Sequence, residues 1–195
     1  MSVSKEQFKK IKSKYQYLSS WAIWATEDET PKSNVGDLTI LDPDCNKNLL
    51  SQLNTEVVFV ALNISRGDIK TPFGNFHDHR PAATDFKIRF AFKDTPFWGG
   101  YMTDIIKDFE EKISGKVKDY LSKNRDFEKQ NVAVFLEELN DIGAKNPILI
   151  AFGNEVYSIL NRYLKDKFKI IKVSHYANYT NKEKYREQIR TICKF

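Results

Sequence analysis

The sequence predicts an α/β protein with three layers (α/β/α), in which helices cover both faces of a central four-stranded parallel sheet. Short, continuous apolar runs rich in β-branched residues recur along the chain, and such runs are typical of strands buried on both faces. Between them lie segments with apolar residues at helical spacing. Strands that alternate with helices in this way favour a parallel sheet. The expected strands are residues 57–62, 101–106, 147–152 and 169–174.

The bulk composition suits a single domain with a sizeable core. Of the 195 residues, 41% are hydrophobic and 13% are aromatic. No run is long enough to span a membrane and the N-terminal segment lacks the apolar stretch of a signal peptide, so we expect a cytoplasmic protein with no membrane partner. The formal net charge of +5 is spread along the chain. It is compatible with a nucleic-acid partner, but many enzymes have a similar charge.

The two cysteines do not indicate a cofactor. Cys45 and Cys193 lie far apart and have no metal-binding spacing, which predicts reduced thiols. A count of two also excludes an iron–sulfur cluster held by four cysteines. We therefore expect no cofactor.

The first 55 residues are expected to form a helical extension, and residues 56–195 the α/β core. Residues 4–18 place apolar side chains at helical spacing among lysines, which predicts an amphipathic helix. Residues 27–48 are rich in turn-forming residues and predict a long surface excursion. A short helix over residues 46–53 is expected to lead into the first strand.

The segment after the first strand, residues 64–99, shows no clear period. It holds several Pro, Gly and Phe residues, and with them His77 and His79. A long segment without regular structure inside one domain is usually functional or contains an element that has not been recognised. We interpret it as a lid or the wall of a pocket.

The rest of the chain alternates more clearly. Residues 101–107 are the second strand candidate, although the pattern also allows a helix over 105–121. Residues 127–142 repeat apolar side chains at helical spacing and are followed by a glycine, a common helix end. A further helix is expected to begin at Asn154, and a last one covers residues 182–194.

Polar side chains follow several predicted strands at the point where each strand ends. They are Asn63 and Ser65 after the first strand, Asp104 in the second, and His175 and Asn178 after the last. In open α/β sheets ligands bind beyond the carboxyl ends of the strands, so these residues are candidates for one site. Ordinary structural roles also remain open, since Asp104 could cap a helix from residue 105 and His175 could be a turn histidine.

Five short motifs in this order resemble the uracil-DNA glycosylase superfamily. They are ALNIS, PFGNF, TDIIK, FGNEVYSIL and SHYAN, and the match spans roughly residues 57–180. The resemblance implies the three-layer fold of that superfamily and a DNA-repair hydrolase. Such an enzyme would cleave the N-glycosidic bond of a base in DNA or in a nucleoside.

The resemblance also implies roles for individual residues. Asn63 falls where the superfamily holds the residue that positions the attacking water, and His175 where a histidine stabilises the leaving base. Phe73 falls near the aromatic residue that stacks on the base. Asp104 stands in place of the Asn that recognises the base. Together with these, we expect substrate contacts from Ser65, Phe73, Phe76, Asp104 and Asn178.

The aspartate at position 104 predicts an altered base preference. An asparagine both donates and accepts hydrogen bonds, whereas an ionised aspartate only accepts. A carboxylate oxygen facing a carbonyl of uracil would create a desolvated repulsion of about 1–3 kcal/mol. We therefore expect weak or no activity on uracil and a better fit for an amino-bearing base.

Two alternatives remain open. Ile64 and Ser65 replace the Pro-Gly of the superfamily's first loop, which favours a nucleobase- or nucleotide-binding protein of the same fold without catalysis. The second alternative is a metal-dependent hydrolase that uses His77, His79 and His175 as nitrogen ligands.

Overall fold

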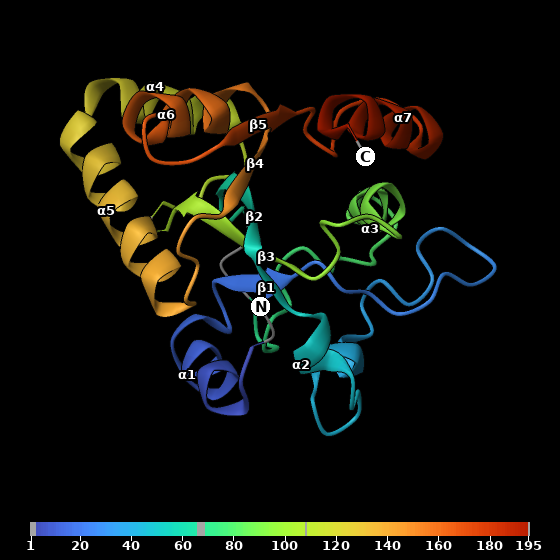
Figure 1. The fold of residues 1–195 in the computed structure, drawn as a ribbon. Coiled ribbons are helices and arrows are strands. Elements are labelled where there is room, and N and C mark those ends of the chain that lie inside the picture. Colours follow the sequence, from blue (N-terminus) through green and yellow to red (C-terminus); the bar gives the residue numbers. More distant parts are fainter. Residues whose placement is uncertain (1–2, 66–68, 108, 195) are drawn as a thin grey trace.

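The computed structural model describes residues 3–65, 69–107 and 109–194. In these residues a five-stranded sheet with the order β1-β3-β2-β4-β5 runs through the centre of the molecule (Figure 1). The strands are β1 (Ser19–Trp21), β2 (Asn54–Asn63), β3 (Gly100–Ile106), β4 (Ile148–Phe152) and β5 (Ile170–Val173).

The four predicted strands form and pair as expected. β2 is parallel to β3 on one side and to β4 on the other, and β4 is parallel to β5. Phe59 of β2, for example, lies in register with Met102 of β3 and Ile150 of β4, and all three side chains are buried. The apolar runs of β2, β3 and β4 are therefore explained by burial on both faces of the sheet, whereas β5 is an edge strand of which only Val173 is buried.

The fifth strand, β1, was not predicted and makes the sheet mixed. It pairs antiparallel with β3, with Ser20 opposite Met102. Its three residues are too few to show a period of two, and all three are buried. The prediction that the first 55 residues form a helical extension was therefore wrong, because part of this segment is a strand of the central sheet.

Helices lie against both faces of the sheet. In Figure 1, α4 (Ser114–Lys123), α5 (Arg125–Asp141) and α6 (Asn154–Leu164) lie to the left of the strands, and α3 (Phe86–Phe92) and α7 (Lys182–Cys193) to the right. Below them are α1 (Lys5–Tyr15) and the short α2 (Leu49–Gln52). A 3₁₀ helix, η1, covers Leu38–Leu41. Within the described ranges no helix has the length and apolar character needed to cross a membrane.

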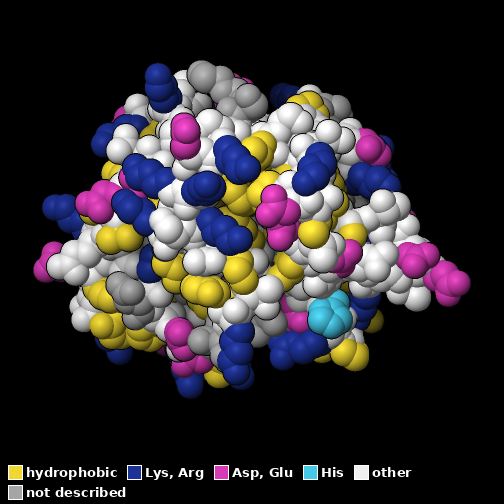
Figure 2. Space-filling view, turned by 90° about the horizontal axis from the view of Figure 1, so that it is seen from below, with side chains coloured by type: hydrophobic (Ala, Val, Ile, Leu, Met, Phe, Trp, Pro, Cys, Tyr) yellow, Lys and Arg dark blue, Asp and Glu magenta, His cyan; other side chains and the backbone are white. Residues whose placement is uncertain are grey.

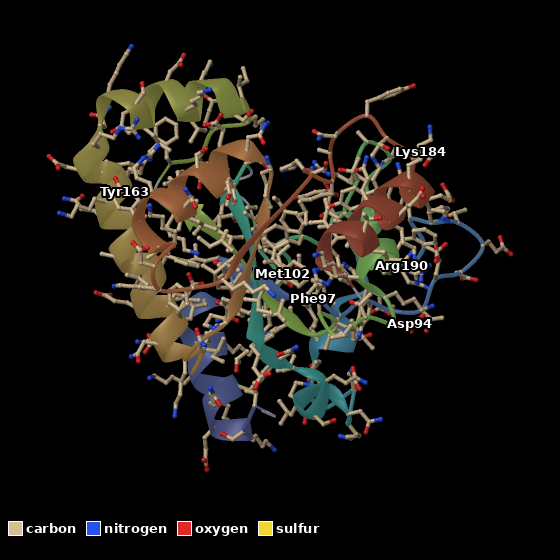
Figure 3. All side chains as sticks on the ribbon, turned by 45° about the horizontal axis from the view of Figure 1, so that its top comes forward. Asp94, Phe97, Met102, Tyr163, Lys184 and Arg190 are labelled. Carbon is tan, nitrogen blue, oxygen red and sulfur yellow. The ribbon has the colours of Figure 1, made fainter. Side chains whose placement is uncertain are left out.

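The two helical layers enclose two separate cores, as the alternation of side chains along a strand requires. Val58 and Val60 of β2 pack toward α4, α5 and α6, whereas Phe59 packs toward α3 and α7. Figure 3 shows Met102 and Phe97, two members of the second core, near the centre of the molecule.

Two predictions between β2 and α4 need correction. Residues 64–99 contain regular structure, because α3 lies within them and packs against α7. Its apolar period is hidden by Arg89, which is buried and donates hydrogen bonds to backbone carbonyls, among them Ser33 O at 2.6 Å. The alternative helix over 105–121 does not form: β3 continues to Ile106, and α4 begins at Ser114.

The order of the four parallel strands determines where a ligand can bind. Of these four strands, β2 comes first in the chain but lies between β3 and β4. The chain therefore runs from β2 to β3 in one direction along the sheet, and then from β3 across β2 to β4 in the opposite direction. The connection to β3 carries α3 on one face, and the connection to β4 carries α4 and α5 on the other. Such a reversal opens a crevice at the carboxyl ends of the central strands.

Candidate functional site

A cavity of about 1000 Å³ lies at the carboxyl ends of the parallel strands. The end of β2, the segment before α3, the segment before α4, the start of α6 and the turn after β5 all contribute to its lining. Its volume exceeds the roughly 300 Å³ expected for a single base and lies at the upper end of ordinary ligand pockets. Six of the predicted residues line it: Asn63, Ser65, Phe76, Asp104, His175 and Asn178.

Asp104 contributes a buried carboxylate to the lining of the cavity. Its side chain is only 2% exposed, and Oδ2 accepts a hydrogen bond from Asn75 Nδ2 at 2.8 Å. Burial raises the pKa of Asp104 from its usual 3.8 to about 6, and the nearby Glu138 adds to this effect, whereas Lys107 and Asn75 oppose it. Because β3 runs through residue 104 and no helix starts at 105, the helix-capping alternative was wrong.

His175 is a neutral hydrogen-bond donor. Its Nδ1 accepts from the backbone N–H of Ala177 at 3.1 Å, so this nitrogen carries no proton and the ring proton lies on Nε2. The ring stacks on Tyr176 with 4.4 Å between the centroids. Burial lowers the pKa of His175, which keeps the ring uncharged near neutral pH.

The side chain of Asn63 holds the segment that precedes α4. Its Nδ2 donates to the backbone carbonyls of Phe109 at 3.0 Å and of Glu111 at 2.9 Å. Asn63 therefore lines the cavity with its amide nitrogen already used within the protein. Its oxygen, for which no donor lies among the described residues, can accept a hydrogen bond from a ligand or a water molecule.

Aromatic rings form part of the apolar lining of the cavity. Phe76 is buried and lines it, and the positive φ of 63° at this residue turns the chain sharply. The indole of Trp24 donates to the carbonyl of Phe76, which holds the turn in place. Phe152 at the end of β4 also lines the cavity and contacts Tyr176 edge to face at 5.2 Å.

Phe73 does not lie in this cavity, contrary to expectation. Its side chain is 1% exposed and packs against Phe8 of α1 with 5.6 Å between ring centroids. Its backbone carbonyl accepts a hydrogen bond from Ser20 Oγ at 2.7 Å. Phe73 therefore has a structural role, in which its ring contacts α1 and its carbonyl contacts β1. The nearby aromatic residue that lines the cavity is Phe76.

The structure does not support the metal-site alternative. His77 is 4% exposed, and its two ring nitrogens lie 3.0 Å from the backbone carbonyl oxygens of Asn75 and Ile23. It also stacks on Trp24 and thus serves as a structural residue of the core. His79 is absent from the lining that includes His175. Among residues 3–65, 69–107 and 109–194, no group of three His, Cys, Asp or Glu side chains is arranged to hold a metal ion.

Asn75 and Phe152 are among the cavity residues that the sequence did not indicate. Asn75 lies in the motif PFGNF, but nothing in the pattern distinguishes an asparagine that contacts a buried carboxylate from one that only stabilises a turn. Phe152 belongs to a buried strand, as the sequence predicts, and its position at the end of that strand also places it in the cavity. Both roles depend on contacts between segments far apart in the chain.

The face of the molecule shown in Figure 2 carries no separate basic patch. On the face shown in Figure 2, Lys and Arg side chains are interspersed with acidic, apolar and uncharged ones rather than gathered in one patch.

No family model, curated protein or solved structure matches this chain.

Proposed function

We propose that this protein is a uracil-DNA glycosylase-like hydrolase with the three-layer fold of that superfamily. It binds a base of DNA or of a nucleoside in the cavity and cleaves the N-glycosidic bond. The observation that carries the proposal is the convergence of Asn63, Asp104 and His175 on one cavity. These residues come from three different strand ends, far apart in the chain, and together they supply the functions that this reaction needs.

The chemistry follows from the state of each group. In the hydrolysis, the oxygen of water bonds to the sugar carbon, the carbon–nitrogen bond breaks with its electron pair going to the base, and a proton from the water neutralises the base. The Nε2–H of neutral His175 can donate to the negative charge that develops on the leaving base. The side-chain oxygen of Asn63 can accept from the attacking water, and the ring of Phe76 offers a stacking surface.

We expect His175→Ala to slow base release by about 10²–10³-fold, the usual cost of removing a donor that stabilises developing negative charge. The assay measures free base released from oligonucleotides that each carry one modified or mispaired base, and from nucleosides. His79→Ala is the matched control, because His79 does not line this cavity. Absence of release from every substrate, or equal rates for the wild-type protein and His175→Ala, would contradict the proposal.

A non-catalytic base-binding protein is the second candidate, and one observation favours it. The amide nitrogen of Asn63 is engaged with Phe109 and Glu111, so this side chain has less freedom to orient a water molecule. Ile64 and Ser65 also replace the Pro-Gly expected from the superfamily. Saturable binding of nucleosides measured by calorimetry, without release of base over days, would favour this candidate over the hydrolase.

A further inference from the structure

The hydrogen bonds of Asn75 determine the orientation of its amide group. Its Oδ1 accepts from the backbone N–H of Phe76 at 3.1 Å, and its Nδ2 donates to Asp104 Oδ2 at 2.8 Å. The same nitrogen lies 3.4 Å from the carbonyl of Leu18, just before β1. A flipped amide would place oxygen against the carboxylate and NH₂ against an N–H group, so only this orientation satisfies the partners.

This arrangement makes Asn75 a positioning residue for the cavity. It holds Oδ2 of Asp104 and, through the neighbouring backbone N–H, the turn that carries the ring of Phe76. Both of these side chains line the cavity. Within the part of the chain that the structure describes, no donor contacts the other carboxylate oxygen, Asp104 Oδ1. That oxygen is therefore available to a ligand as a hydrogen-bond acceptor.

We propose that Asn75 and Asp104 act as a pair that selects a base with two adjacent N–H donors, as on the N1–H and 2-amino edge of guanine. This inference rests on the proposed function, since it requires a base in the cavity. Oδ1 of Asp104 can accept from one N–H group of the base, and the remaining lone pair of Oδ2 can accept from the other. The pair offers the base only acceptor atoms, because both hydrogens of the Asn75 amide point to partners within the protein. Uracil presents a carbonyl oxygen beside its N–H, so one of its groups would oppose the carboxylate.

Binding of such a base depends on the ionisation of Asp104. Because burial raises the pKa of Asp104 to about 6, the carboxylate is largely ionised at pH 7.5 and largely protonated at pH 5. Two charged residues outside the cavity also affect this pKa: Lys107, which follows β3, lowers it, and Glu138 on α5 raises it. The other charged residues that line the cavity are Asp78, Arg80, Asp85, Glu111, Lys112, Glu155 and Lys172.

The experiment compares three nucleosides by isothermal titration calorimetry. Guanosine has both donors, inosine lacks the 2-amino group, and uridine has a carbonyl in its place. At pH 7.5 we expect guanosine to bind about 5- to 150-fold more tightly than inosine, the usual discrimination of one bidentate contact. Its affinity should fall as the pH is lowered through 6, whereas that of uridine should not fall. Uridine binding as tightly as guanosine would overturn the inference.

Variants separate positioning by Asn75 from mere structural support. In Asn75→Leu the donor to Asp104 is lost, so the pH midpoint for guanosine binding should move upward. If this variant does not fold, the exchanged pair Asn75→Asp/Asp104→Asn tests the same idea. It restores an amide–carboxylate hydrogen bond but presents an amide to the cavity, so the preference should move from guanosine toward uridine. An unchanged pH midpoint in folded Asn75→Leu, or an unchanged preference in the exchanged pair, would overturn the inference.

The outcomes for the inference and for the proposed function are distinguishable. Guanosine preference without any base release supports the Asn75–Asp104 pair and contradicts the hydrolase. Base release with equal affinity for guanosine and uridine supports the hydrolase and contradicts the pair. If none of the three nucleosides binds and no base is released, both are overturned.

Discussion

Replacing Glu138 with leucine is expected to lower the free energy of unfolding by about 3–5 kcal/mol, the usual cost of breaking a buried ion pair from one side. Glu138 is fully buried on α5, and its Oε2 lies 2.8 Å from Nζ of Lys107. Its Oε1 accepts hydrogen bonds from the hydroxyls of Tyr101 at 2.7 Å and Thr103 at 2.9 Å. The leucine variant would leave a buried ammonium group and two hydroxyls without their acceptor.

Two control variants make this prediction specific. Glu137→Leu changes the preceding residue of the same helix, which is exposed, and should alter the stability by no more than about 0.5 kcal/mol. The double variant Glu138→Leu/Lys107→Met removes both charges. It should recover part of the lost stability, because no unpaired charge is then left buried. Urea denaturation at pH 7 measures all three. A loss in Glu138→Leu equal to that in Glu137→Leu would show that the buried pair does not stabilise the fold.

Replacing Asp104 with asparagine is expected to stabilise the protein at neutral pH. The folded state raises the pKa of this carboxyl from 3.8 to about 6 and therefore binds a proton more tightly than the unfolded chain does. Stability then falls as the pH rises from about 4 to 6, and at higher pH the ionised carboxylate costs about 3 kcal/mol. An asparagine avoids this cost and can still accept the hydrogen bond from Asn75. The variant should therefore gain up to about 3 kcal/mol at pH 7.5 and almost nothing at pH 4.

The measurement is a series of urea denaturation curves between pH 4 and pH 7.5 for the wild-type protein and Asp104→Asn. Asp141→Asn provides a control of opposite sign. Lys14, Tyr15 and Lys10 donate hydrogen bonds to Asp141, which hold its pKa well below the usual range, so its loss should destabilise the protein at neutral pH. A stability difference for Asp104→Asn that does not change with pH would contradict the expected titration.

A buried carboxylate that lowers stability at neutral pH is typical of a functional site. Asp104 lies in the cavity, and an asparagine would fit the same position with less cost. The aspartate is therefore better explained by what it offers a ligand than by its contribution to folding. This supports the proposed contact between Asp104 and an amino-bearing base.

The sequence predicted the central sheet because burial leaves a strong local pattern. β2 and β4 are short apolar runs bounded by polar or turn-forming residues, and the parallel pairing of the strands follows from the helices between them. α5, α6 and α7 were predicted from the spacing of their buried side chains. The position of Asn63, Asp104 and His175 in one cavity also followed, since strand ends of a parallel sheet meet at one edge.

By itself, then, the sequence determined the α/β class, the four parallel strands and the edge of the sheet where polar side chains gather. The tertiary structure decided what depends on contacts between distant segments. β1 exists only because β3 offers it a partner, and α3 can bury Arg89 because backbone carbonyls of another segment surround its guanidinium. The tertiary structure also decided that Phe76 rather than Phe73 lines the cavity, and that Asn75 contacts Asp104. The raised pKa of Asp104 has the same origin, because desolvation depends on every segment that surrounds a side chain and not on its neighbours in sequence.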